Sequence, residues 1–145
     1  MKQFLESTQT KVIEVSGLQY VDEDWGQLDN YTETSPIEWP CCLIDISNAD
    51  FSDIGTDKEA VPQSRQEALG YITLTFADLK IIEEGSLNVN AWSLQDLIEE
   101  VHGKIHGFTP VAGSGKLIRT SLKRVKRDDG IQQYDVVYTI GMRNI

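Results

Sequence analysis

The stretch RQEALGYITLTFADL, residues 65–79, decides the fold of this chain. Every second position in it holds a small or apolar side chain: Ala68, Gly70, Ile72, Leu74 and Phe76. Successive side chains of a β-strand point to opposite faces of the sheet, so this alternation predicts a strand with one face against a core. The alternation does not identify the neighbouring strands.

Two strand segments precede it in the sequence. Residues 37–46 are apolar and β-rich, which predicts a strand with buried side chains on both faces, and residues 18–21 form a shorter candidate. Cys41 and Cys42 are adjacent, so on a strand they point to opposite faces and a disulfide between them is not expected. We interpret them as two small hydrophobic residues in a protein of a reducing compartment.

The clearest helical pattern covers residues 92–106. Ser93 followed by Asp96 resembles a capping box, and Gly107 is placed to end the helix in a left-handed conformation. The apolar residues recur at the spacing of one helical face: Leu94, Leu97, Ile98, Val101 and Ile105. This pattern predicts an amphipathic helix that packs on a sheet.

The two ends of the chain supply the remaining elements. Residues 2–15 predict a helix that ends at Gly17. Residues 116–126 and 132–142 predict a hairpin around the Asp-Asp-Gly turn at 128–130. The second hairpin strand should lie on the core, because alternate positions in it are apolar or aromatic: Tyr134, Val136, Tyr138 and Ile140.

The expected order is therefore helix, three strands, helix, two strands. That order predicts an α+β fold, with a mainly antiparallel sheet of about four to five strands and two helices packed on it. A length of 145 residues predicts a single domain over residues 1–145. Long acidic loops are expected near residues 22–36 and 47–63. Loops of that length are uncommon in a small domain unless they bind something or become ordered on assembly.

Composition excludes several classes of function. With 23 acidic and 13 basic residues, the formal charge is −10, which disfavours general binding to nucleic acid or to anionic membranes. No window approaches the roughly 18 consecutive apolar residues of a membrane span, and the N-terminus does not resemble a signal peptide. The charge is divided unevenly. Residues 1–60 hold 13 acids and 3 bases, whereas residues 111–145 hold 3 acids and 7 bases.

No pattern indicates catalysis, a cofactor or a metal. The segment Ala112–Leu117 superficially resembles a phosphate loop, but it lacks the required first glycine and the hydroxyl after the lysine. Glu99, His102 and His106 have zinc-like spacing on a helix, yet no third strong ligand is adjacent, and histidines near a helix C-terminus are also favoured by the helix dipole. Neither cysteine has a histidine nearby. We expect no enzymatic activity, no cofactor and no bound metal.

The basic strand near residues 116–127 is the most informative charged feature. It carries six bases and no acid. It could follow a nucleic-acid backbone, or it could be a solvated edge strand whose charges discourage aggregation. It could also meet an acidic region, 22–33 or 45–59, of a neighbouring copy, and such a heterologous contact builds rings or filaments. The candidate contact residues are Arg119, Lys123, Arg124 and Lys126, opposed by Asp22, Glu23, Asp24 and Asp53.

Four segments carry a resemblance to a known family. They read VDEDWGQLD at 21–29, WPCCLIDI at 39–46, AWSLQDLIEEVHGKIHGF at 91–108 and GKLIRT at 115–120. Together they resemble proteins encoded in prophages of Bacteroides-type bacteria. The broader pattern, which covers most of the chain, is similar to phage tail terminator or tail-completion proteins.

The resemblance implies an α+β subunit that forms a ring, commonly six-fold. Such a ring caps the tail tube, stops its growth and offers a surface to the head connector. The implied partners are the chain itself, the tail tube protein and the head–tail connector protein, with DNA only passing through the ring. The implied location is the bacterial host cytoplasm during assembly and then the virion tail. The alternative from the residues is a nucleic-acid-binding accessory protein of a mobile element that uses the 116–127 strand.

Overall fold

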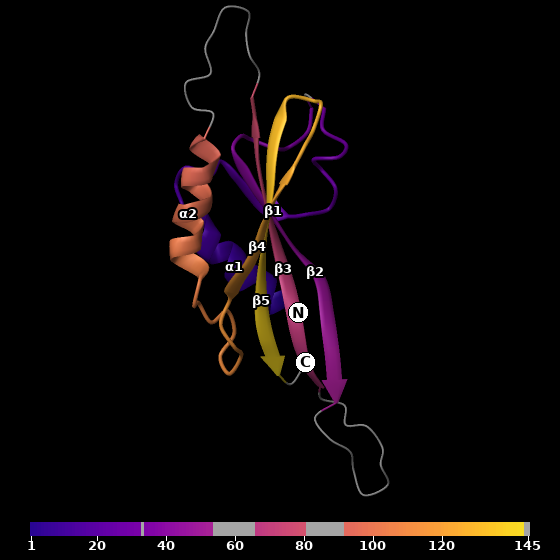
Figure 1. Ribbon diagram of the computed structural model, residues 1–145, viewed down its shortest axis with the longest axis vertical. Helices are drawn as coiled ribbons and strands as arrows, with labels where there is room; N and C mark the ends of the chain where they lie inside the picture. Colours follow the sequence, from indigo (N-terminus) through magenta and orange to yellow (C-terminus); the bar gives the residue numbers. More distant parts are fainter. Residues whose placement is uncertain (33, 54–65, 81–91, 144–145) are drawn as a thin grey trace, which may run out of the picture.

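The computed structural model describes residues 1–32, 34–53, 66–80 and 92–143 (Figure 1). Its elements follow the predicted order, with two helices and five strands. They are α1 (Lys2–Ile13), β1 (Tyr20–Glu23), β2 (Cys41–Asp53), β3 (Gln66–Leu79), α2 (Ser93–Ile105), β4 (Ile118–Val125) and β5 (Ile131–Arg143). The predicted α+β fold class is confirmed.

The strands form one mixed sheet in the order β1-β2-β3-β5-β4. Every neighbouring pair is antiparallel except β1 and β2, which run parallel along Tyr20–Glu23 and Cys41–Ile44. The central strand β3 pairs along nearly its whole length with β2 on one side and β5 on the other. As a result, β1 and β4 lie at opposite edges of the sheet.

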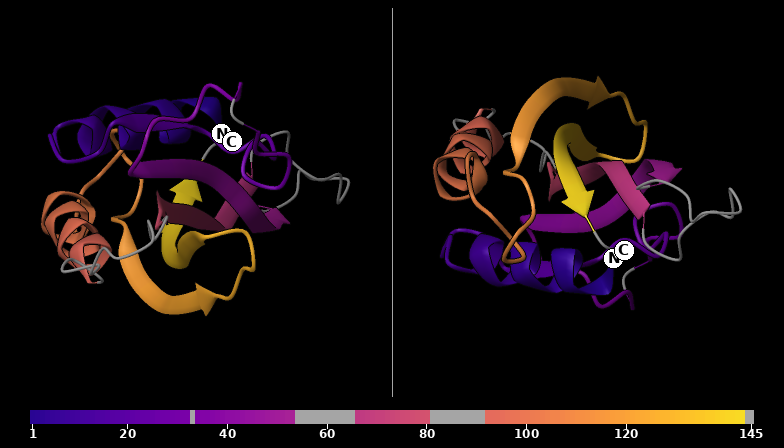
Figure 2. Two further views of the ribbon diagram at one scale, coloured as in Figure 1. Left: turned by 90° about the horizontal axis from the view of Figure 1, so that it is seen from above. Right: turned by 90° about the horizontal axis from the view of Figure 1, so that it is seen from below.

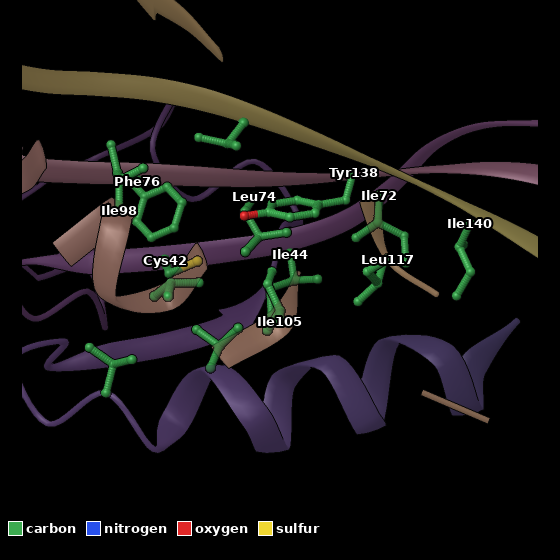
Figure 3. Packing of buried hydrophobic residues seen from close by; sticks show 14 of the residues in the cluster. Cys42, Ile44, Ile72, Leu74, Phe76, Ile98, Ile105, Leu117, Tyr138 and Ile140 are labelled. Carbon is green, nitrogen blue, oxygen red and sulfur yellow. The ribbon is translucent and has the colours of Figure 1, made fainter. Parts of the chain in front are cut away.

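Both helices pack on the same face of the sheet, as the end-on views of Figure 2 show. Figure 3 shows the core between the helices and the sheet. Cys42 and Ile44 of β2 and Ile98 and Ile105 of α2 all belong to it. The predicted core faces of β3 and β5 are confirmed. Their buried residues include Ala68, Ile72, Leu74, Phe76, Tyr134, Val136, Tyr138 and Ile140.

A second, smaller cluster lies on the opposite face. Leu28 and Ile37, from the segment between β1 and β2, pack there against Cys41 and Leu43. Cys41 thus belongs to one cluster and Cys42 to the other, as the alternation of a strand requires, and both are buried free thiols.

The segment Ser47–Asp53 was expected to be loop and is instead the second half of β2. Its residues pair with β3 from Asn48↔Tyr71 to Asp53↔Gln66, after a bulge between Ile46 and Asn48. Backbone pairing with β3 stabilises this half of the strand although its side chains are mostly exposed, so it carries no apolar period. Residues 54–63 of the expected loop lie outside the described residues. At the other acidic loop, Asp22 and Glu23 belong to β1.

The N-terminus of α2 and the C-terminus of α1 differ from the sequence prediction. Trp92, not Ser93, caps α2, no side chain bonds the cap, and Ser93 Oγ instead accepts a hydrogen bond from Lys80 Nζ at 3.1 Å. Gly17 does not end α1, which stops at Ile13. A Cβ at Gly17 would lie 2.5 Å from Leu97 Cδ2, the end of a flexible side chain, so a larger residue there would require Leu97 to shift. Gly107 does adopt the predicted positive φ, at 79°.

The two faces of β3 allow a direct test of the core assignment. Leu74 is fully buried, so Leu74→Ala should lower the free energy of unfolding by about 2–5 kcal/mol. Leu69→Ala, on the opposite face and 43% exposed, should change it by less than about 0.5 kcal/mol. Urea unfolding monitored by circular dichroism measures both, and equal losses for the two variants would contradict the assignment.

Candidate functional site

The basic strand β4 lies at an edge of the sheet and has no buried residue. Ile118 and Leu122 expose large apolar side chains between its charges. Of the predicted contact residues, Arg119 is bound within the chain, since its Nη1 donates to Glu99 Oε1 of α2 at 2.9 Å. Lys123, Arg124 and Lys126 are exposed, and within the described ranges no acidic group forms an ion pair with them.

The predicted acidic partners lie away from β4. Asp22, Glu23 and Asp24 are at the β1 edge, on the other side of the sheet, and Asp53 is at the end of β2. Asp22 accepts a hydrogen bond from the Tyr20 hydroxyl at 2.8 Å, and Asp53 accepts one from Gln66 at 2.9 Å. One copy of the chain therefore does not bring the predicted bases and acids together.

Arg127, just past β4, does join a base to the acidic segment within the chain. Its guanidinium donates to Leu28 O at 2.9 Å and lies 3.7 Å from Asp29. The same group bonds Asp129 at 2.6 Å, and the pKa of Asp129 is lowered mainly by this hydrogen bond. Arg127 thus ties the segment after β1 to the β4–β5 turn, a link that sequence spacing did not identify.

A small polar cluster joins α2 to the hairpin. His102 Nδ1 lies 3.0 Å from the Tyr138 hydroxyl, and its ring centroid is 4.6 Å from that of His106. His106 Nδ1 accepts a hydrogen bond from the Arg119 backbone N–H at 3.3 Å. In the described part of the chain, no group of three or more potential ligands is arranged to hold a metal ion, and Glu99 is engaged by Arg119.

The remaining sequence candidates have structural roles. The segment 112–115 is a turn, with Gly113 at φ 85°, and Gly115 N donates to Gly141 O at 2.8 Å before the chain enters β4. Burial raises the pKa of the Cys41 thiol to about 12, and that of Cys42 well above its usual value. Both cysteines are therefore neutral thiols near pH 7 and are shielded from reagents.

The sequence analysis named residues 45–59 as a candidate acidic contact region but did not predict that Ser47–Asp53 belongs to a strand. Because β1 pairs with β2 only along Cys41–Ile44, the rest of β2 has no described strand on that side. We call the part of β2 after Ile44, residues 45–53, its uncovered half. It carries Asp45, Asp50 and Asp53, together with Phe51, whose side chain is 51% exposed. Its side chains are mostly exposed and show no apolar period, so the sequence offered no signal that this segment is a strand.

Comparisons with known proteins give a likeness of fold. No family model and no curated protein matches the chain. A solved chain from the virion of a native gene transfer agent particle is similar in structure, with a TM-score of 0.53 and 11% sequence identity. The match covers 91% of this chain and 84% of that one. None of the described helices is long and apolar enough to cross a membrane.

Arg127 is the basis of a stability prediction. Arg127→Ala removes a partly buried, charge-assisted set of hydrogen bonds, so the free energy of unfolding should fall by about 1.5–3 kcal/mol. Arg127→Lys should not restore the loss, because lysine lacks the planar fork. Arg124→Ala, at an exposed position nearby, is the matched control. Hydrogen exchange of residues 24–32 should accelerate only in the Arg127 variants, and unchanged exchange there would refute the link.

The His102 cluster predicts a pH dependence. Burial, then the charges of Arg119 and His106, lowers the pKa of His102 from its ordinary value of 6.5. The unfolded chain therefore binds the proton more readily, and stability should fall as the pH drops below 6.5 toward the folded-state pKa. Comparing the free energy of unfolding at pH 7 and pH 5.5 measures this fall. His102→Gln should flatten that slope, and an identical slope in the variant would refute the prediction.

Proposed function

We propose that this chain is a structural protein of a phage-like particle, and more specifically a ring-forming tail terminator. The main support is the likeness of fold, over 91% of the chain, to a chain of a gene transfer agent virion. The resemblance of sequence segments to phage tail-completion proteins supports the same role. In this proposal the protein is not an enzyme and uses no cofactor.

The charge distribution supports assembly from copies of one chain. The exposed bases Lys123, Arg124 and Lys126 lie at one edge of the sheet, and acidic side chains lie on its other side. A contact between two different surfaces is heterologous, and it closes into a ring when the rotation between copies allows. Opposite charges at such a contact fix the orientation of the copies and speed their encounter.

In the proposed mechanism the ring stacks on the last layer of the tail tube. One face of the ring binds the tube protein, and the other face offers no surface on which a further tube layer can add. That second face instead receives the head–tail connector protein. Assembly takes place in the bacterial host cytoplasm, and the protein then remains in the virion tail.

Loss of the gene in a particle-producing strain should leave tails of irregular length that are not joined to heads. Negative-stain electron microscopy of purified particles measures tail length and head attachment. Complementation with the wild-type gene is the control. Tails of uniform length joined to heads in the deletion strain would contradict the terminator role.

Reversing two exposed bases tests the self-association. Arg124→Glu with Lys126→Glu should reduce the sedimenting mass at low salt, because the contact loses its attraction, and raised salt should weaken the wild-type association too. Lys2→Glu with Lys104→Glu makes the same change of net charge on the helices and should leave the mass unchanged. Unchanged mass in the β4 variant would contradict the assigned contact.

The nucleic-acid alternative is separated by a binding assay. A salt-dependent gel shift of labelled DNA at near-physiological salt, lost in the same β4 variant, would favour that alternative. The net charge of −10 predicts no such shift for the wild-type chain.

A further inference from the structure

The two sides of the sheet differ in how their backbone groups are covered. At β1, side chains already occupy the outward groups. Gln9 Nε2 donates to Val21 O at 3.0 Å, Gln27 Nε2 donates to Glu23 O at 2.9 Å, and Asp22 Oδ1 accepts from Glu23 N at 2.8 Å. A strand that approached β1 would have to displace these bonds, so β1 is a poor site for strand addition.

Past β1, no described strand covers the outer side of β2. Figure 1 shows β2 running on beyond β1 along the side of the sheet. Asp50, Phe51, Ser52 and Asp53 are all exposed, and no described strand pairs with them there. The bulge between Ile46 and Asn48 precedes this region, which is regular through its pairing with β3.

β4 provides the other uncovered edge. Among the described strands it pairs only with β5, and a register shift between Arg119 and Ser121 leaves residues 121–125 as its regular part. Arg119 N is bonded to His106, but no described group outside β5 bonds the backbone of residues 121–125. Edge strands present unpaired N–H and C=O groups in this way.

The charges identify which edges fit together. β4 carries Arg119, Lys123 and Arg124, so two β4 strands side by side would repel each other. The uncovered half of β2 carries Asp45, Asp50 and Asp53 and no base. The edge that complements β4 in both charge and exposure is therefore found on a second copy of the same chain.

The directions of the strands, and the sides of the sheet to which their side chains point, agree with a pairing of β4 with β2 of a second copy. β2 is antiparallel to β3, β3 to β5, and β5 to β4, so β4 and β2 run in opposite directions. Copies related by rotation that continue the sheet would place β4 of one antiparallel to β2 of the next. Leu122 lies opposite Val136 and Phe51 opposite Ala68, so both face the helix side. Lys123 and Asp50 both face the other side.

We propose that β4 of one copy adds as an antiparallel strand to the uncovered half of β2 of the next copy, with Leu122 opposite Phe51 and Lys123 opposite Asp50. The proposal rests on the proposed ring, and it names the surfaces that close it. This register places the exposed apolar side chains of Leu122 and Phe51 together on one face of the sheet. It places the opposite charges of Lys123 and Asp50 together on the other face. Asp22, Glu23 and Asp24, at the covered β1 edge, take no part in it.

A disulfide trap tests the register. Directly opposed positions on antiparallel strands have Cα atoms about 4.5–5.5 Å apart, which suits a disulfide. In the variant Leu122→Cys with Phe51→Cys, mild oxidation should produce a ladder of cross-linked species on a non-reducing gel. The native Cys41 and Cys42 are buried and should not contribute. Leu122→Cys with Leu69→Cys, another exposed apolar pair, is the control and should give no ladder.

A charge exchange tests the same pairing without cross-linking. Lys123→Glu alone and Asp50→Lys alone should each weaken self-association by about fivefold, because like charges then face each other. The double variant, which restores an opposite pair, should return close to the wild-type value. Glu23→Lys at the covered edge is the matched control and should have no effect.

The outcomes separate this inference from the proposed function. A wild-type chain that self-associates, but gives no ladder and no recovery in the double variant, overturns the strand pairing and leaves the ring. A wild-type chain that stays monomeric at every salt concentration, and whose deletion leaves normal particles, overturns both.

Discussion

An open sheet has two edge strands, and the backbone N–H and C=O groups on their outer sides need hydrogen-bond partners. How these groups are bonded determines which surfaces of this molecule can bind another strand. The central pairing of β3 with β2 and β5 supplies a core face that the helices cover. The backbone groups at the outer strands still need partners. Side chains from α1 and from the segment after β1 supply them at one edge. Along β4 and the second half of β2, no strand in the described part of the chain pairs with the outward backbone groups.

The sequence predicted the elements whose burial follows a simple period. Ile72 and Leu74 on β3, and Val136 and Tyr138 on β5, alternate cleanly because only one face of each strand is buried. The second half of β2 escaped prediction because both of its faces are largely exposed, and pairing with β3 alone makes it a strand. The N-cap of α2 was predicted one residue too late, at Ser93, whose hydroxyl accepts a hydrogen bond from Lys80 and does not cap the helix.

The sequence could identify the basic residues of the candidate site, but it could not identify which acidic residues oppose them. The cluster Lys123, Arg124 and Lys126 is visible as an acid-free run, and the edge position of β4 agrees with it. The acids are spread over the first 60 residues, so composition alone cannot rank Asp22 against Asp53. Which acidic residues lie at an uncovered edge depends on the strand lengths, because the four-residue β1 covers only part of the thirteen-residue β2.

The bond between Arg127 and Leu28 spans 99 positions of the chain. Contacts between residues so far apart in sequence slow folding more than local contacts do, because closing a long loop costs chain entropy. During synthesis the segment after β1 leaves the ribosome long before its anchor exists. The cluster that holds Leu28 and Ile37 against Cys41 and Leu43 also contains Ile131 of β5, so residues made much later in synthesis complete the packing of this early segment.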